Sequence, residues 1–244
     1  MRIAFLSDTH GNYIALNAVL ADLKLQGADQ IIFLGDAATI GSHPRETLDA
    51  LQELGCTVHV MGNHDEAVLH PERATDLQIA PSLHASLAWT IERMSGSDLD
   101  FLRTFCPTYE LELNAHHSLL CFHGSPRSNT DVILSTTPTE TLDELFGNTS
   151  TSIWVGGHTH VQLLRRYENK LLLNSGSIGN AFKSAFMPGR TPELLPWAEY
   201  TLLDVDGKAV SADMRRVPFD AQEVLRQMSA SGNPAAPWWL DQYK

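Results

Sequence analysis

The sequence is poor in cysteine, in long apolar runs and in basic side chains. Its 244 residues include only three cysteines, none of them in a CxxC pair: Cys56, Cys106 and Cys121. An odd number of widely spaced cysteines argues against a disulfide framework or a thiolate zinc site and fits a reducing cytosol. The first apolar run is too short for a signal peptide, and no other run approaches the roughly 20 residues of a membrane span. We therefore expect a cytoplasmic protein without a membrane anchor.

Basic side chains are outnumbered by acidic ones. The chain has 17 Lys and Arg against 29 Asp and Glu, which gives a formal net charge of -12. Non-specific nucleic-acid binding depends on clustered Lys and Arg, so we do not expect it. A nucleotide substrate stays open, because bound divalent cations locally reverse the sign of the field. Hydrophobic residues make up 43% of the chain, which is typical of a globular protein with a sizeable core.

Strands and helices alternate in the first 61 residues. Apolar runs at 3–6, 31–34 and 58–61 predict buried strands, and helices are expected at about 14–23 and 44–54. This alternation predicts neighbouring parallel strands joined by right-handed crossovers. In such sheets the working groups gather beyond the carboxyl ends of the strands.

The rest of the chain is richer in strand patterns. Two helices, interrupted near 95–97, are expected within 82–105, and we interpret 66–107 as a helical insertion. Strands are then expected at 109–113, 118–122, 153–155, 161–167, 171–173, 198–204 and 209–217, before a helix at 220–228 and a loose tail. No linker or repeat interrupts the chain, so we expect one domain over 1–244. Oligomeric state stays open, because the tail around Trp238 and Trp239 either covers a neighbouring subunit or docks on its own chain.

Five short polar motifs follow expected strands. They are SDTHGN, LGD, MGNHD, FHGSP and GGHTH. Singly, an Asp at such a place is more often a turn former or helix cap than a ligand. Together, their carboxylate and imidazole groups suit borderline divalent metals. A single zinc site needs three or four ligands, whereas this set supplies seven: Asp8, His10, Asp36, Asn63, His123, His158 and His160.

The order of these motifs resembles that of the calcineurin-like metallophosphoesterases. All five blocks are present between residues 8 and 160. HGSPR at 123–127, the helical pair at 89–105 and RRVPFD at 215–220 resemble the small prokaryotic, phosphodiesterase-like branch. The resemblance implies an α/β fold of α+β character, a four-layer αββα sandwich in which two mixed β-sheets are flanked by helices.

The resemblance also implies a role for each motif residue. Asp8, His10, Asp36 and His160 would hold one metal, and Asp36, Asn63, His123 and His158 a second, with Asp36 bridging them. Manganese is the first expectation, with iron, zinc or nickel as alternatives. A hydroxide between the ions would attack phosphorus. His64 would be the catalytic acid that protonates the departing oxygen.

Nearby polar residues leave two interpretations open. Asn12 either contacts a substrate phosphate or forms the turn before the first helix. Arg127 either binds phosphate or is solvated. Asp65 either orients His64 or caps the helix that follows, and the cap is slightly favoured. The turn at 176–179 is either a backbone nest or a simple tight turn.

Two segments depart from the family pattern. Ser175 stands where Pro is common, and the expected Arg after the 176–179 turn is displaced to Lys183 or Arg190, or lost. The segment 37–44 lacks an expected Tyr. Both changes bear on substrate preference rather than on metal chemistry.

We expect a phosphodiesterase for a small or nucleotide-like phosphate ester. The alternatives are a phosphomonoesterase, a dinucleoside polyphosphate hydrolase and, outside the enzymes, a metal-binding interaction scaffold.

Overall fold

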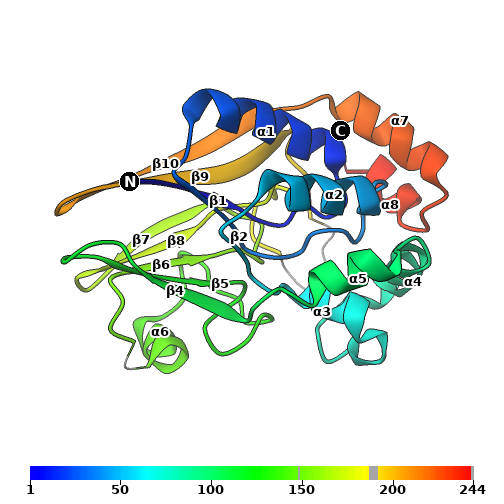
Figure 1. Cartoon of the computed structure of the whole chain (residues 1–244). Coiled ribbons are helices and arrows are strands. Elements are labelled where there is room, and N and C mark those ends of the chain that lie inside the picture. Colours follow the sequence, from blue (N-terminus) through cyan, green and yellow to red (C-terminus); the bar gives the residue numbers. More distant parts are fainter. Residues whose placement is uncertain (148, 187–191, 243–244) are drawn as a thin grey trace.

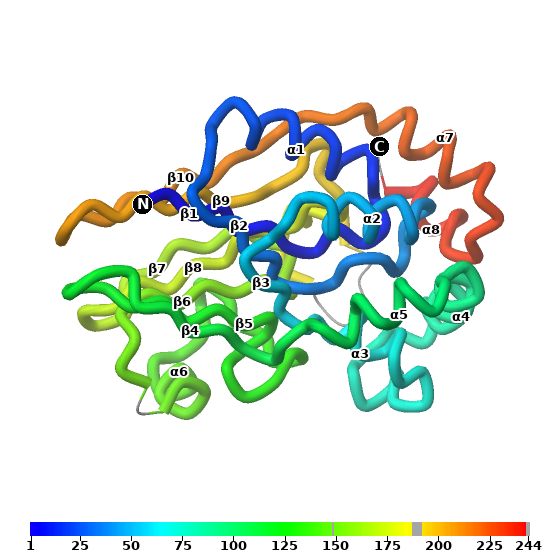
Figure 2. The backbone as a smooth tube through the Cα atoms, viewed as in Figure 1, coloured from blue at the N-terminus to red at the C-terminus, as the bar shows by residue number. Residues whose placement is uncertain are grey.

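Two five-stranded sheets lie face to face in the computed structural model, which describes residues 1–147, 149–186 and 192–242 (Figures 1 and 2). The first sheet has the order β10 (Ala209–Pro218), β9 (Trp197–Asp206), β1 (Arg2–Leu6), β2 (Gln30–Phe33) and β3 (Val58–His59). The second has the order β4 (Thr108–Glu112), β5 (Ser118–Phe122), β6 (Ile153–Gly156), β8 (Lys170–Asn174) and β7 (Leu163–Tyr167). In the first sheet, β1, β2 and β3 are parallel on one side, and the β1–β9 and β9–β10 pairs are antiparallel on the other. In the second sheet, β5, β6 and β8 form a parallel centre with the antiparallel strands β4 and β7 at its two edges.

The central strand β1 is buried on both of its faces. Ile3 and Phe5 point into the core between the two sheets, whereas Ala4 and Leu6 belong to the core beneath the helices. All four side chains are fully buried. A strand covered on both faces needs a continuous apolar run, which is the pattern that identified it in the sequence.

Helices cover the outer faces of the sandwich. Helices α1 (Tyr13–Gln26) and α2 (Pro44–Leu54) lie over the first sheet, and α6 (Thr139–Phe146) lies over the second (Figure 1). The ring of Phe146 stacks on Trp154, with centroids 3.7 Å apart. The order helix, sheet, sheet, helix confirms the predicted four-layer αββα sandwich with two mixed sheets.

A helical region follows β3. It contains α3 (Asn63–Leu69), α4 (His84–Ile91), α5 (Gly96–Leu102) and two 3₁₀ turns, Pro71–Arg73 and Pro81–Leu83. Ser95 caps α5 by accepting a hydrogen bond from the Asp98 amide. His59 stacks on Phe105, with ring centroids 5.0 Å apart. This histidine, outside the five motifs, therefore packs among aromatic side chains.

Two helices were not anticipated. Helix α6 is eight residues long, and its buried residues are Leu142 and Phe146. An apolar pattern this short does not distinguish a helix from a loop in the sequence. The expectation of a loose tail was wrong. After α7 (Ala221–Ser231), the short helix α8 (Ala236–Leu240) packs Trp239 against Ile40 and Met228. The tail thus docks on its own chain.

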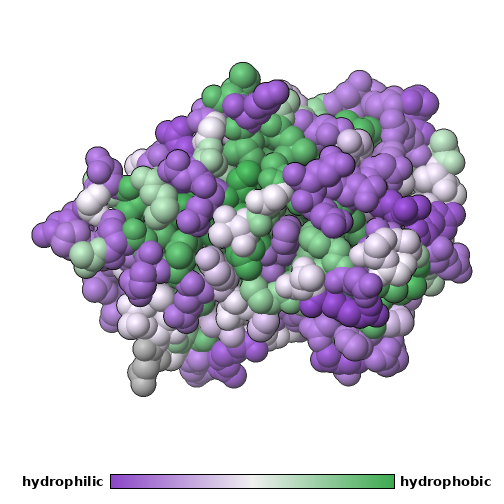
Figure 3. All heavy atoms as spheres, in the orientation of Figure 1, coloured by the Kyte–Doolittle hydropathy of each residue, from purple (hydrophilic) through white to green (hydrophobic). Residues whose placement is uncertain are grey.

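The surface in view carries mostly hydrophilic side chains, with hydrophobic ones gathered in the upper middle (Figure 3). Within the described ranges, no helix combines the length and the apolar character that crossing a membrane requires.

A hydrogen-bonded ion pair ties α1 to the edge of the first sheet. Arg215 of β10 donates to the Asp22 carboxylate from Nε at 2.7 Å and Nη2 at 3.0 Å, and the Tyr200 hydroxyl of β9 donates at 2.6 Å. The charged side chains are 19% and 23% exposed, so water screens them only in part. The hydrogen bonds from Arg215 hold the pKa of Asp22 below its ordinary value.

We expect Asp22→Asn to lower the free energy of unfolding by about 1.5–3 kcal/mol at neutral pH, the range for hydrogen bonds to charged groups. The pKa of Asp22 is depressed in the folded state, so its contribution is present above the unfolded-state pKa of about 3.9 and is lost as pH falls through the folded-state pKa. Urea unfolding, followed from neutral pH down through the titration of Asp22, measures both effects. Asp204→Asn, which removes a more exposed pair with Arg2, is the control. An equal loss in both variants would contradict the prediction.

Candidate metal centre

The loops that follow β1, β2, β3, β5 and β6 carry all seven predicted metal ligands. Backbone hydrogen bonds bring these loops together: the Asp8 amide donates to the Gly35 carbonyl at 2.9 Å, and the His10 amide to the Asp36 carbonyl at 3.0 Å. The His158 amide, from the second sheet, donates to Asp8 Oδ2 at 3.1 Å. The parallel strands of both sheets therefore end at one place, as the sequence predicted.

Backbone strain is concentrated in these loops. Five of the seven predicted ligands have positive φ angles without being glycine: Asp8 at 53°, His10 at 44°, Asp36 at 62°, His158 at 68° and His160 at 57°. The left-handed region disfavours residues with a side chain. Such strain persists where surrounding contacts over-determine it, and it gathers at functional sites.

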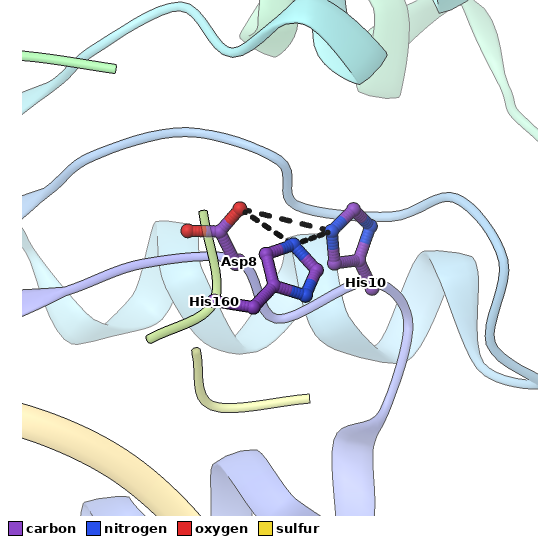
Figure 4. A group of neighbouring side chains, drawn as sticks. All are labelled: Asp8, His10 and His160. Atoms are coloured by element: carbon purple, nitrogen blue, oxygen red, sulfur yellow. Dashed lines mark hydrogen bonds and ion pairs between the residues drawn. The ribbon is translucent and has the colours of Figure 1, made fainter. Parts of the chain in front are cut away.

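Asp8, His10 and His160 form the first cluster (Figure 4). His160 Nε2 lies 3.1 Å from Asp8 Oδ1 and 3.0 Å from His10 Nε2. Their ligand atoms lie within 4.8 Å of one another, and all three residues are buried. These are the distances at which one cation can bind all three atoms.

Asp36, His123 and His158 form the second cluster. His123 Nε2 lies 3.3 Å from Asp36 Oδ2, which is also 3.6 Å from His10 Nε2 in the first cluster. The Asp36 carboxylate therefore stands between the two clusters, the place a bridging ligand requires. Asn63 lies beside them, with its Nδ2 donating to the Leu77 carbonyl at 2.9 Å.

Several buried ligand atoms have no hydrogen-bond partner. These are Asp8 Oδ1, Asn63 Oδ1 and His123 Nε2. A buried polar atom without a partner costs about 1–3 kcal/mol, so each requires an explanation. The atoms belong to three of the predicted ligands, and their donor chemistry suits divalent cations. The residues therefore fit a two-metal site.

The hydrogen bonds behind the imidazoles leave their inner nitrogens free. His160 Nδ1 lies 2.9 Å from the Asn180 carbonyl, and His123 Nδ1 lies 2.6 Å from the Leu34 carbonyl. A carbonyl accepts only, so each Nδ1 carries a proton, and each Nε2 presents a lone pair whenever its ring is neutral, as it must be to bind a metal. Carbonyls in this position fix the tautomer and orientation of metal-binding histidines.

The protonation of the site follows from burial and from its two carboxylates. Burial lowers the pKa of His10 well below its ordinary value, and burial with the facing His123 lowers the pKa of His158 to about 4. Burial opposes protonation of His123 too, but the facing Asp36 raises the pKa of His123 to about 10. A proton on His123 thus offsets part of the negative charge of the two carboxylates. A bound cation would take the place of that proton.

His64 lies beside the clusters and contacts Thr39, a residue that sequence reasoning missed. Thr39 Oγ1 lies 2.8 Å from His64 Nδ1 and 3.4 Å from His10 Nδ1. When His10 donates from Nδ1 to the Thr39 hydroxyl, the lone pair of His10 lies on Nε2. When the Thr39 hydroxyl donates to Nδ1 of neutral His64, the proton of His64 lies on its Nε2. Thr39 has no motif of its own and approaches His64 only in the folded chain.

Asp65 caps α3, the role slightly favoured from the sequence, and also has a role that the sequence did not suggest. Its carboxylate accepts hydrogen bonds from the amides of Asp36 at 2.7 Å, Ala37 at 2.8 Å and Gly62 at 3.1 Å. The last contact is part of a capping box on α3, which begins at Asn63 rather than at residue 66. The first two hold the strained backbone at Asp36. Asp65 therefore fixes the proposed bridging ligand, and no hydrogen bond to His64 is found within the described part of the chain.

Glycine is required where loops meet. A Cβ on Gly62 would overlap Oδ1 of Asp36, and one on Gly179 would overlap the Thr9 carbonyl. The Gly179 amide donates to the Asp8 carbonyl at 2.9 Å. The turn at 176–179 is thus a tight turn packed on the Asp8 loop, the simpler of its two interpretations.

Neither of the two tentative substrate contacts lines the cavity at the clusters. Asn12 caps α1 through Oδ1, which accepts from the Ala15 amide at 3.1 Å, and its Nδ2 donates to the Gly179 carbonyl at 3.0 Å. Arg127 is exposed, donates to the Glu144 carbonyl at 3.0 Å and lines a separate cavity of about 310 Å³. Contact of either residue with a substrate stays a prediction.

The clusters form one end of a cavity of about 580 Å³. His10, Asp36, Asn63, His64 and His160 line that end. Lys183, one candidate for the displaced basic group, pairs instead with Glu193 at 2.8 Å on the surface. Arg190, the other candidate, lies outside the described residues.

Known proteins share this sequence pattern and fold. The model of the calcineurin-like phosphoesterase superfamily domain matches residues 1–188. An uncharacterized protein of Methanocaldococcus jannaschii is 31% identical over 176 residues, which are 72% of this chain and 69% of that protein.

Solved structures extend the likeness over the whole chain. A metallophosphoesterase from Sphaerobacter thermophilus is similar with a TM-score of 0.75 and 23% identity, covering 99% of this chain and 98% of that one. A hypothetical protein from Pyrococcus horikoshii OT3 is similar with a TM-score of 0.77 and 21% identity, covering 96% of this chain and 94% of that one. At such identities these structures establish a shared fold. Since the family model covers most of its length, this chain belongs to the calcineurin-like phosphoesterase superfamily.

Proposed function

We propose that the protein is a phosphodiesterase that uses two divalent cations to hydrolyse a small or nucleotide-like phosphate ester. The observation that carries the proposal is the pair of clusters with the Asp36 carboxylate between them, whose buried ligand atoms include three without a hydrogen-bond partner among the described residues. Asp8, His10, Asp36 and His160 would hold one cation, and Asp36, Asn63, His123 and His158 the other. When bound, such cations neutralise phosphate charge and lower the pKa of a bound water.

The chain's own residues would position these groups and supply a proton. Asp65 fixes the backbone at Asp36, and the carbonyls behind His123 and His160 aim their Nε2 atoms inward. Burial, partly offset by Asp36, lowers the pKa of His64. In its imidazolium form, His64 would donate Nδ1–H to Thr39 Oγ1 and would give the proton on Nε2 to the departing oxygen, leaving neutral imidazole.

Manganese is the metal we propose, with iron, zinc or nickel as alternatives, because the mixed imidazole, carboxylate and amide ligands suit all of them. The ligand set includes only two carboxylates, Asp8 and Asp36. Four positive charges on two ions would leave the site cationic, which favours an anionic ester. A phosphomonoesterase, a dinucleoside polyphosphate hydrolase and a metal-binding scaffold are the rival functions.

We expect the manganese-loaded protein to cleave bis-p-nitrophenyl phosphate faster than p-nitrophenyl phosphate. The leaving group is the same in both esters, so the comparison isolates the site's preference for one charge or two on the phosphate. Release of p-nitrophenol measures both rates. A faster monoester reaction would replace the diesterase assignment with the phosphomonoesterase. Absence of both metal uptake and turnover would favour the scaffold.

We expect Thr39→Val to slow esters with poor leaving groups by about tenfold while sparing those with good ones, since proton donation matters most where the departing oxygen is basic. His64→Ala should show the same pattern by about 10²-fold or more. Rates across a series of substituted phenyl esters measure the leaving-group dependence.

Thr39→Ser keeps the hydroxyl and should restore the wild-type dependence, which a merely structural role for Thr39 would not predict. Metal content should be unchanged in all three variants. Equal slowing of good and poor leaving groups would contradict the assigned role of His64.

A further inference from the structure

The cavity that contains the metal clusters has a second, apolar end. Six side chains form what we call the apolar wall: Leu83, Val132, Leu134, Phe182, Phe186 and Trp238. They come from a 3₁₀ turn, two loops and helix α8, segments far apart in the sequence. Neither the proposed metal chemistry nor the proton transfer uses any of them.

The apolar wall begins directly at the metal clusters. The ring of Phe182 packs against that of His160, with centroids 4.4 Å apart, and the Phe182 amide donates to the His160 carbonyl at 2.9 Å. A phosphate held at the clusters would therefore have one ester substituent within reach of the wall. A volume of about 580 Å³ lies within the usual range for sites that bind small molecules.

Two side chains of the apolar wall are largely exposed to solvent. Phe186 is 55% exposed and Val132 is 53% exposed. Isolated exposed apolar residues are ordinary, but apolar side chains gathered at a cavity mark a binding site. A hydrocarbon group seated there would remove both from water.

The described part of the cavity lining has no basic side chain to bind a longer phosphate chain. Of the described residues that line the cavity, none is Lys or Arg. Each additional phosphate of a dinucleoside polyphosphate would bring negative charge into a cavity whose only proposed cations lie at the clusters. A diester carries one charge and a second organic group, and both match this cavity.

We propose that the cavity takes a phosphodiester whose retained substituent, the one that is not the leaving group, is a bulky hydrocarbon, aromatic or alkyl, and lies against the apolar wall. The inference rests on the proposed phosphodiesterase function and names its substrate class. A nucleoside substituent, whose sugar and base present many polar groups, is the poorer match. The wall residues thus determine specificity, whereas the clusters provide the chemistry.

Esters that share p-nitrophenol as leaving group test this specificity. We expect kcat/KM for phenyl p-nitrophenyl phosphate to exceed that for methyl p-nitrophenyl phosphate by about tenfold or more, and to exceed that for the thymidine 5′ ester. Phe186→Ala should lower the phenyl-to-methyl ratio by about three- to tenfold. Leu164→Ala, which removes a similarly exposed side chain outside the cavity, should leave the ratio unchanged.

Calorimetric titration separates this inference from the hydrolytic function. Diphenyl phosphate should bind the manganese-loaded protein about tenfold or more tighter than dimethyl phosphate, and Phe186→Ala should weaken only the former. Hydrolysis with equal rates for the methyl and phenyl esters would overturn the inference and leave the phosphodiesterase intact. Equal binding of the two phosphates would overturn it whether or not the esters are cleaved. Selective binding without hydrolysis would support the wall and contradict the phosphodiesterase.

Discussion

The site depends on one electrostatic constraint, the burial of two carboxylates among converging imidazoles. Asp8 and Asp36 are 0% and 1% exposed, and in water such charges would be solvated on all sides. Without cations, a proton at His123 provides part of the balance, since Asp36 raises its pKa to about 10. Divalent ions would satisfy the same carboxylates and the unpartnered oxygens of Asp8 and Asn63 together. Metal binding and the stability of these loops are therefore linked.

The fold meets this constraint by making the strand ends rigid. Main-chain hydrogen bonds join the loops after β1 and β2, and the carboxylate of Asp65 holds the amides of Asp36 and Ala37. Left-handed backbone at Asp8, His10 and Asp36 turns their side chains toward one point. Because Gly62 has no Cβ, the loop after β3 can approach the Asp36 carboxylate closely. Preorganisation of this kind places the ligand atoms before any cation arrives.

Much of this arrangement could be predicted from the sequence because it follows from local rules. Buried apolar runs such as residues 3–6 identify parallel strands, and polar residues at their carboxyl ends must then meet. That reasoning predicted that the five motifs meet beyond the strand ends, and the family resemblance assigned Asp36, His123 and His158 to one metal. It failed where partners are distant along the chain or patterns are short. Thr39 meets His64 across 25 positions, the docking of α8 depends on Ile40 and Met228, and the apolar wall has no periodicity at all.

Metal stoichiometry tests the central claim most directly. Manganese-loaded protein, freed of excess ion and assayed by mass spectrometry of its metal content, should hold about two ions per chain. Asp36→Asn should hold fewer than about one, because the proposed bridge serves both ions. His70→Ala, a histidine outside the clusters, should match the wild type. A wild-type protein that retains one ion or none, or an Asp36→Asn variant that retains two, would contradict the account.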